Sequence, residues 1–195
     1  VEKVAFEPPI QLNDKVEDYL QAALDGQMSS LAKILTRSVK RYAETSNRGD
    51  WLMSGTDKLR DDPSQIALLT ASIFYVRETE KAQDDIVGGS KDAMEKHLDN
   101  IKSQLKDLIT ITSGNLNKSD RTRVMVMITL DAHSRDIIEK FIREGALARD
   151  DFQWQSQLKQ KFEVDKDPSK AGQGRGHGFI LNASFFYDFE YLGNG

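Results

Sequence analysis

The chain has 195 residues, enough for one domain or for part of a larger one. Hydrophobic residues make up 38% and charged residues 30%, which favours an elongated helical body with much solvated surface, and the net charge of −4 gives no general attraction to nucleic acid. The absence of cysteine excludes disulfides and thiolate metal sites, and no apolar run approaches the roughly 20 residues of a membrane span, so no membrane partner is expected.

The first predicted element is a long helix that follows an extended entry with Pro8-Pro9. Apolar residues recur there at helical spacing, namely Val16, Tyr19, Leu20, Ala23, Leu24, Met28, Leu31, Ile34, Leu35, Val39 and Tyr42. At 1.5 Å per residue such a helix is roughly 40 Å long, which indicates a strut. The polar stretch 45–61 around Trp51-Leu52 is predicted to be a loop.

Two further helices follow with clear boundaries. Asp62-Pro63-Ser64-Gln65 supplies an acidic N-cap and a proline at the first helical position, and Gly88-Gly89 ends the helix. Ser90 can cap the next helix, which Gly114 closes. Its apolar positions alternate steps of four and three, as in helices packed nearly side by side; they are Met94, Leu98, Ile101, Leu105, Leu108 and Thr112.

A fourth helix is predicted from Ser119-Asp120 to the stop at Gly145. Its inward-facing residues are Val124, Met127, Leu130, Ile138 and Phe141. A shorter fifth helix, residues 150–162, would present Trp154, Leu158 and Phe162.

The C-terminal part is predicted to be β structure. Glycines break regular structure in 166–178, and apolar residues then occupy odd positions, namely Phe179, Leu181, Ala183, Phe185, Tyr187, Phe189 and Tyr191. That period-2 pattern fits one strand or a hairpin, whose aromatic face needs a partner surface. The predicted fold is mainly α, an elongated bundle of four long helices and one short helix ending in a β strand or hairpin. Its segments are a helical part (1–165), a flexible glycine-rich connector (166–178) and a β segment (179–195).

Candidate catalytic and ligand-binding patterns are weak. Neither Gly172-x-Gly174 nor Gly88-Gly89-Ser90-Lys91 has the spacing or the strand-to-helix context of a phosphate-binding loop. The group Asp131, His133 and Asp136, with Arg135 beside it, invites a metal or catalytic interpretation of its histidine and two carboxylates, but on a helix only His133 and Asp136 can share a face. These four residues are predicted to hold neighbouring helices in register. No catalytic residue, metal site or cofactor site is predicted.

Four stretches carry a resemblance to a known family. The segment Phe185-x-Tyr187-x-Phe189-Glu190-Tyr191-Leu192-Gly193-Asn194 resembles the F-x-Y-x-Y-E-Y-L-G-N segment of dynein heavy chains, which joins the mechanical linker to the first AAA+ module. Three others match in the same order, namely Pro63 to Ile66, Ile128 to Ile137 and Phe152 to Leu158. The resemblance is closer to axonemal outer-arm chains than to the cytoplasmic form.

The resemblance implies that the chain is the C-terminal part of a dynein linker, a bent helical rod whose straightening is the power stroke. It implies that Trp154, Gln157 and Leu158 pack the last linker helix, and that a larger set anchors the rod to the ring: Phe185, Tyr187, Phe189, Glu190, Tyr191, Leu192 and Gly193. This segment would be non-catalytic and hold no cofactor. ATP and Mg²⁺ would bind in the downstream AAA+ ring of a microtubule-stimulated ATPase.

The implied partners are the chain's own AAA+ ring and, through the parent complex, dynein intermediate and light chains and microtubules. The implied location is the axoneme of cilia or flagella, with the cytoplasm left open. An alternative is a helical adaptor whose aromatic C-terminal strand adds to the sheet edge of a partner. A stand-alone hydrolase is disfavoured, because no nucleophile and base occur at a supporting spacing.

Overall fold

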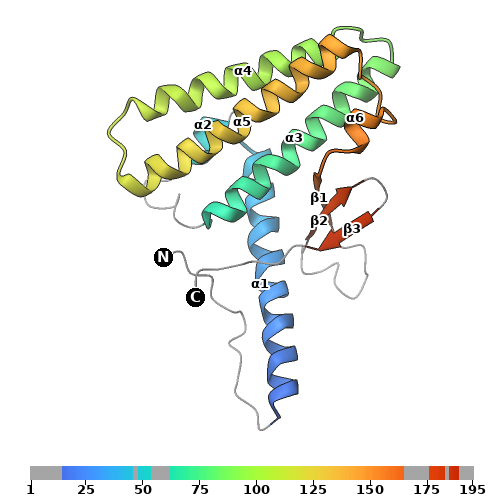
Figure 1. Ribbon diagram of the computed structural model, residues 1–195. Coiled ribbons are helices and arrows are strands. Elements are labelled where there is room, and N and C mark those ends of the chain that lie inside the picture. Colours follow the sequence, from blue (N-terminus) through green and yellow to red (C-terminus); the bar gives the residue numbers. More distant parts are fainter. Residues whose placement is uncertain (1–14, 46–47, 54–61, 165–175, 183–184, 189–195) are drawn as a thin grey trace.

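The computed structural model describes residues 15–45, 48–53, 62–164, 176–182 and 185–188, and it is mainly helical with one small sheet (Figure 1). The long helices are α1 (Val16–Ala43), α3 (Ser64–Val87), α4 (Ala93–Thr112) and α5 (Lys118–Glu144). Two helices are short, α2 (Arg48–Met53) and α6 (Phe152–Gln155). The antiparallel strands β1 (Lys159–Val164), β2 (Gly176–Asn182) and β3 (Phe185–Asp188) pair in the order β1-β2-β3.

The helices form a layer crossed by a strut. Helices α3, α4 and α5 run alongside one another, and α1 crosses this layer and extends well beyond it (Figure 1). The sheet is fixed between them, because β1 contacts α3 and β2 contacts α1. The predicted fold class, an elongated and mainly α bundle that ends in a β strand or hairpin, is confirmed, and the β part is a hairpin.

Local signals set the ends of the long helices. The Asn117 side chain caps α5 by accepting a hydrogen bond from the backbone N–H of Asp120 at 2.9 Å. Gly145 ends that helix in the left-handed conformation (φ 72°), which costs glycine little. The predicted acidic cap on α3 is wrong, because the Asp62 carboxylate instead accepts from Arg41 at 2.5 Å and so ties α3 to α1.

The predicted loop at 45–61 is wrong for the residues that form α2. Trp51 and Leu52 are each 2% exposed, and the Trp51 ring packs edge-on against Tyr42 with ring centroids 4.9 Å apart. Six residues are too few to show helical periodicity in a sequence. Tertiary packing of the two apolar side chains therefore decides this helix.

The predicted fifth helix over 150–162 is also wrong. Helix α6 stops at Gln155, and the chain then enters strand β1, which contains Phe162. The Trp154, Leu158 and Phe162 spacing fits a helix, but a strand pairs here because β2 supplies the hydrogen-bonding partner, with Phe162 opposite Gly178. The predicted 1–165 segment therefore contains a strand as well as helices.

The C-terminal β structure is a hairpin rather than one strand. Its register pairs Phe179 with Asp188 and Ile180 with Tyr187, so odd positions of β2 lie opposite even positions of β3. A single odd-numbered stripe therefore does not run through both strands. Strand β2 begins at Gly176, inside the range predicted as connector, while 166–175 and the odd positions Ala183, Phe189 and Tyr191 lie outside the described residues.

Three buried clusters form the core. The first joins α3, α4, α5 and α6 around Ile138, Phe141 and Trp154. The second joins α1, α2, α3, α4 and α5 around Trp51 and Met127, and the third joins α1, α3 and β1 around Leu35, Ile73 and Phe162. Since each cluster spans at least three elements, the helices and β1 are packed as one body.

Candidate site where the sheet joins the helices

The junction between β1 and α3 is held by apolar and polar contacts together. Phe162 is 8% exposed and packs with Leu35 and Ile73. Arg77 of α3 donates to the Phe162 carbonyl at 3.0 Å, with its guanidinium 5.8 Å from the centre of the ring. Next to it, Lys161 pairs with Glu80 at 2.6 Å. The strand is therefore fixed to the helix at consecutive residues.

Lys159 is the first residue of β1 and an unusual buried cation, 2% exposed. Its ammonium group donates to the carbonyls of Trp154 (3.2 Å), Gln155 (3.1 Å) and Gln157 (3.2 Å). It also lies 5.5 Å from the centre of the Trp154 ring. Burial lowers the pKa of Lys159. This residue, which the sequence analysis did not single out, links α6 to the start of the sheet.

The three residues expected to pack the last linker helix have different environments. Trp154 is 1% exposed and lies edge-on to Phe141, with centroids 6.2 Å apart. Gln157 donates from its side chain to the carbonyl of Gln153 at 3.1 Å. Leu158 follows α6 and is 59% exposed, so its packing role in the linker stays a prediction. It lies between the end of α6 at Gln155 and the start of β1 at Lys159, so it belongs to neither element.

The aromatic anchoring set lies mostly beyond the described residues. The backbone of Phe185 and Tyr187 belongs to β3, which among the strands that the structure describes pairs with β2. Phe189, Glu190, Tyr191, Leu192 and Gly193 lie outside the described residues. Their anchoring role stays a prediction.

The structure separates the four residues predicted to hold helices in register. Asp131 is 1% exposed and forms an ion pair with Arg48 of α2. His133 is exposed, and Arg135 pairs with its neighbour Asp136 at 2.6 Å on the surface of the same helix. Of these four residues, Asp131 forms an ion pair with another helix, whereas the Arg135–Asp136 pair lies within α5.

Arg48 forms a buried polar centre that the sequence analysis missed. Besides Asp131, it donates to the Tyr42 hydroxyl at 3.2 Å and to the Ala71 carbonyl at 3.5 Å, and it is 3% exposed. One side chain thus joins α1, α2, α3 and α5. The only sequence signal was a basic residue three positions before Trp51, which is not specific enough to predict a buried ion pair.

His97 of α4 is a second buried polar group. Its Nε2 lies 3.0 Å from the Thr79 hydroxyl of α3, and it is 5% exposed. Burial, with a smaller contribution from the Arg48 charge, lowers the pKa of His97 to about 4. Burial also raises the pKa values of Tyr75 and Glu78 nearby. The α3–α4 interface therefore holds a neutral imidazole at physiological pH.

The described part of the chain has neither a cluster of metal-ligating side chains nor a helix suited to a membrane. No group of three or more histidine, aspartate or glutamate side chains is arranged there to hold a metal ion. None of the helices described is both long and apolar enough to cross a membrane.

Comparison with known proteins places the chain among axonemal dyneins. It is 36% identical over all 195 residues to the dynein alpha chain of the flagellar outer arm from Chlamydomonas reinhardtii. It is 32% identical over 193 residues to human dynein axonemal heavy chain 9, and 28% identical over 193 residues to the ciliary dynein beta chain of Tripneustes gratilla. No family model matches the chain.

The matches extend over nearly the whole chain but over only a small part of each relative. They cover 99–100% of this chain and about 4% of the length of those three relatives. The resemblance carried by the four motif stretches is thereby confirmed. Since the similarity runs end to end along this sequence and is shared with outer-arm, ciliary and other axonemal heavy chains, the chain belongs to the dynein heavy-chain family.

Proposed function

We propose that this chain is the C-terminal part of the linker of an axonemal dynein motor and transmits force without catalysing a reaction itself. The observation that carries the proposal is the Phe185 to Asn194 motif within a sequence similar from end to end to axonemal heavy chains. In the parent motor, ATP and Mg²⁺ bind in the AAA+ ring, and the motor works on microtubules in cilia or flagella with its intermediate and light chains.

The sheet offers a continuous route for force. The residues expected to anchor the rod to the ring begin within β3, at Phe185 and Tyr187, and those at 189–193 directly follow β3 in the sequence. Strand β3 is hydrogen-bonded to β2, and β2 to β1. A pull on the end of β3 along the strands would load these ladders in shear and, through Phe162 and Lys161, would load α3.

The helical body behind the sheet has the rigidity that a lever needs. Buried side chains join β1 to α1 and α3, and the other two clusters join α3 to α4 and α5. Close-packed interiors of this kind deform little and transmit displacement. Phe162 is a residue of the sheet that belongs to this core.

The full motor provides the test. Phe162→Ala should loosen the junction between sheet and helices, so microtubule gliding should slow severalfold while basal ATP hydrolysis by the ring stays unchanged. The matched control is Val164→Ala on the same strand, where the side chain is 60% exposed. The control should leave both rates unchanged.

A second variant addresses the anchoring motif directly. Replacing Tyr187 and Tyr191 by alanine should likewise impair gliding while basal ATP hydrolysis continues. If gliding survived both the Phe162 and the tyrosine variants intact, the force-transmitting role would be wrong. If ATP hydrolysis were lost as well, these residues would belong to the catalytic machinery instead.

A further inference from the structure

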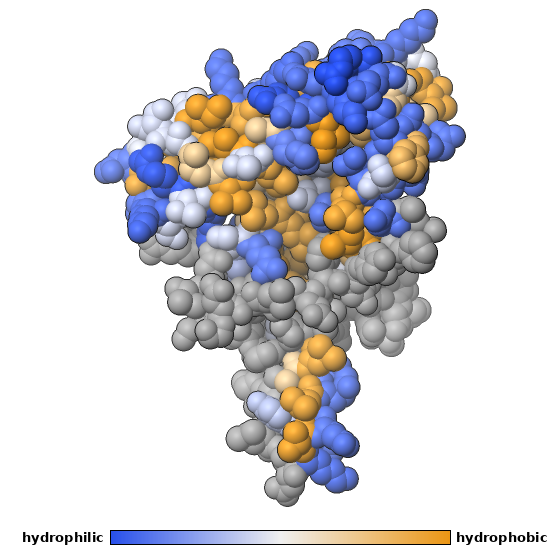
Figure 2. Space-filling view, viewed as in Figure 1, coloured by the Kyte–Doolittle hydropathy of each residue, from blue (hydrophilic) through white to orange (hydrophobic). Residues whose placement is uncertain are grey.

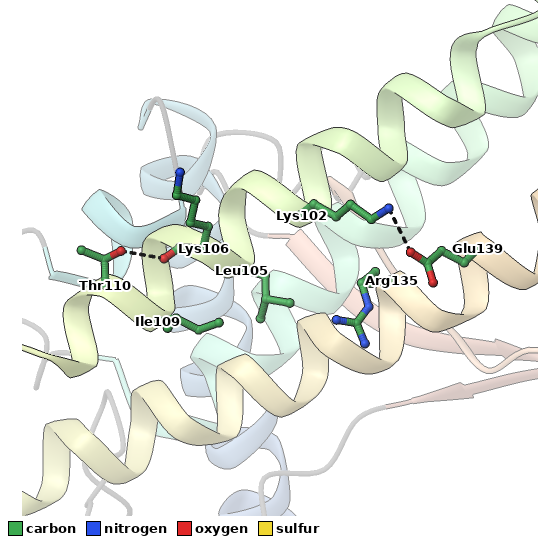
Figure 3. A pocket seen from close by; sticks show the side chains of 7 residues that line it. All are labelled: Lys102, Leu105, Lys106, Ile109, Thr110, Arg135 and Glu139. Carbon is green, nitrogen blue, oxygen red and sulfur yellow. Dashed lines mark hydrogen bonds and ion pairs between the residues drawn. The ribbon is translucent and has the colours of Figure 1, made fainter.

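Helices α4 and α5 leave an open groove on one side of their interface. The groove has a volume of about 570 Å³, and Figure 3 shows its lining residues: Lys102, Leu105, Lys106, Ile109, Thr110, Arg135 and Glu139. Helix α3 contacts both α4 and α5 and lies behind the pair in this view. The groove is therefore on the side of the pair that α3 leaves uncovered.

The floor of the groove is apolar and only partly covered. Leu105 and Ile109 lie one turn apart on α4, and their side chains project toward α5 (Figure 3). Leu105 is 7% exposed, but Ile109 is 51% exposed. An apolar side chain thus remains largely exposed on the floor of the groove.

The rim of the groove is basic, although the chain as a whole has a net charge of −4. Three cations line it, Lys102, Lys106 and Arg135, against one carboxylate, Glu139. Lys102 neutralises that carboxylate at 2.9 Å across the groove. Arg135 is paired with Asp136 at 2.6 Å, whereas Lys106 makes no ion pair with any other residue that the structure describes. An acidic partner would meet an unneutralised cation here.

From this combination we propose that the α4–α5 groove docks an amphipathic α-helix of another polypeptide segment, with apolar residues on one face and acidic residues beside them. Two apolar residues one turn apart would cover Leu105 and Ile109, completing a three-helix packing in which α4 and α5 supply two members. The acidic residues would face Lys106 and the end of Arg135. This inference does not depend on the linker role.

Site-specific photo-cross-linking in the full-length heavy chain within its motor complex tests the inference. A benzophenone amino acid placed at Ile109 should form an adduct with an acidic helical segment, identified by mass spectrometry. The matched control position is Val87 at the end of α3, 86% exposed and outside the groove. Adducts at position 109 no more abundant than at position 87 would overturn the proposal, as would adducts only with a basic segment, nucleic acid or lipid.

A charge reversal tests the acidic character of the partner. Lys106→Glu, combined with the cross-linker at Ile109, should lower the adduct yield roughly fivefold, the size expected of one exposed ion pair. Lys106→Arg should retain the yield, and so should Lys91→Glu in the exposed turn before α4. These lysine side chains are exposed, so the substitutions should leave folding intact. An unchanged yield in Lys106→Glu would overturn the acidic-helix assignment.

Discussion

The two ends of α1 have the same pattern of apolar residues and opposite environments. In its C-terminal half, Leu31, Leu35 and Val39 are 7%, 1% and 6% exposed. In its N-terminal part, Val16, Leu20 and Leu24 are 70%, 59% and 46% exposed, and Figure 2 shows an apolar stripe along the part of α1 that extends beyond the body. Helical spacing thus defines a face, but only contacts with α3 and the sheet bury it.

The largest expected loss of stability comes from the buried Arg48–Asp131 ion pair, which lies in the packed body of helices and not in the exposed outer part of α1. Asp131→Ala would leave the Arg48 guanidinium buried without its counter-charge, at a cost of about 3–5 kcal/mol in the free energy of unfolding. Urea unfolding followed by circular dichroism measures this cost.

A matched control removes an exposed pair instead. Asp85→Ala breaks the Lys81 pair on α3, whose side chains are 75% and 43% exposed, and should cost about 1 kcal/mol or less. The double variant Arg48→Met, Asp131→Leu should recover much of the loss, because no unpaired charge remains. Equal losses in the free energy of unfolding for Asp131→Ala and Asp85→Ala would show that the buried Arg48–Asp131 pair does not stabilise the packed helices more than an exposed pair does.

The comparison within α1 is tested by one truncation at each end. Leu35→Ala should cost about 2–5 kcal/mol, because it leaves a cavity in the cluster shared with Phe162. Leu20→Ala removes the same atoms from an exposed site and should change stability by about 0.5 kcal/mol or less. Thermal unfolding of both variants gives the difference. A cost at Leu20 equal to that at Leu35 would mean that the outer part of α1 is packed as well.

A smaller effect should appear as a pH dependence of the free energy of unfolding, which arises from the buried His97. The pKa of His97 is about 4 in the folded chain against an ordinary value of 6.5, so between these values the unfolded chain binds a proton that the folded chain does not. The contribution of neutral His97 to the free energy of unfolding is therefore fully present above pH 6.5. It falls by about 2–3 kcal/mol as the pH drops toward 4.

His97→Gln should flatten that pH dependence in urea unfolding between pH 7 and 4.5. Burial raises the pKa of Glu78, which acts in the opposite sense as the pH falls, but this carboxyl is present in both chains. The difference between the two curves therefore reports His97. Parallel curves would show that the imidazole is not held neutral in the folded state.

Much of the helical fold could be predicted because its signals are local. The start of α1 at Val16, the end of α3 before Gly88 and the end of α5 before Gly145 follow from apolar periodicity and glycine stops. The fifth helix was mispredicted because Trp154, Leu158 and Phe162 are four apart. A segment this short fits more than one period, and its strand partner lies beyond a glycine-rich stretch.

The candidate site was less predictable. Trp154 was expected to be a packing anchor and is buried, but the contacts that join the sheet to the helices, Arg77 to Phe162 and Lys161 to Glu80, connect residues 85 and 81 positions apart. A single sequence gives no sign of such pairs. The α4–α5 groove likewise depends on which side of the helix pair α3 covers.

The sequence alone determined the four long helices, their faces and the membership of the chain in the dynein heavy-chain family, because periodicity, capping residues and motifs are encoded over a few neighbouring positions. Tertiary structure decided that α2 is a helix, that 159–164 is a strand, and that Arg48 and Asp131, 83 residues apart, form a buried pair. These features owe their stability to burial and to partners distant in the sequence, and both exist only once the chain has folded.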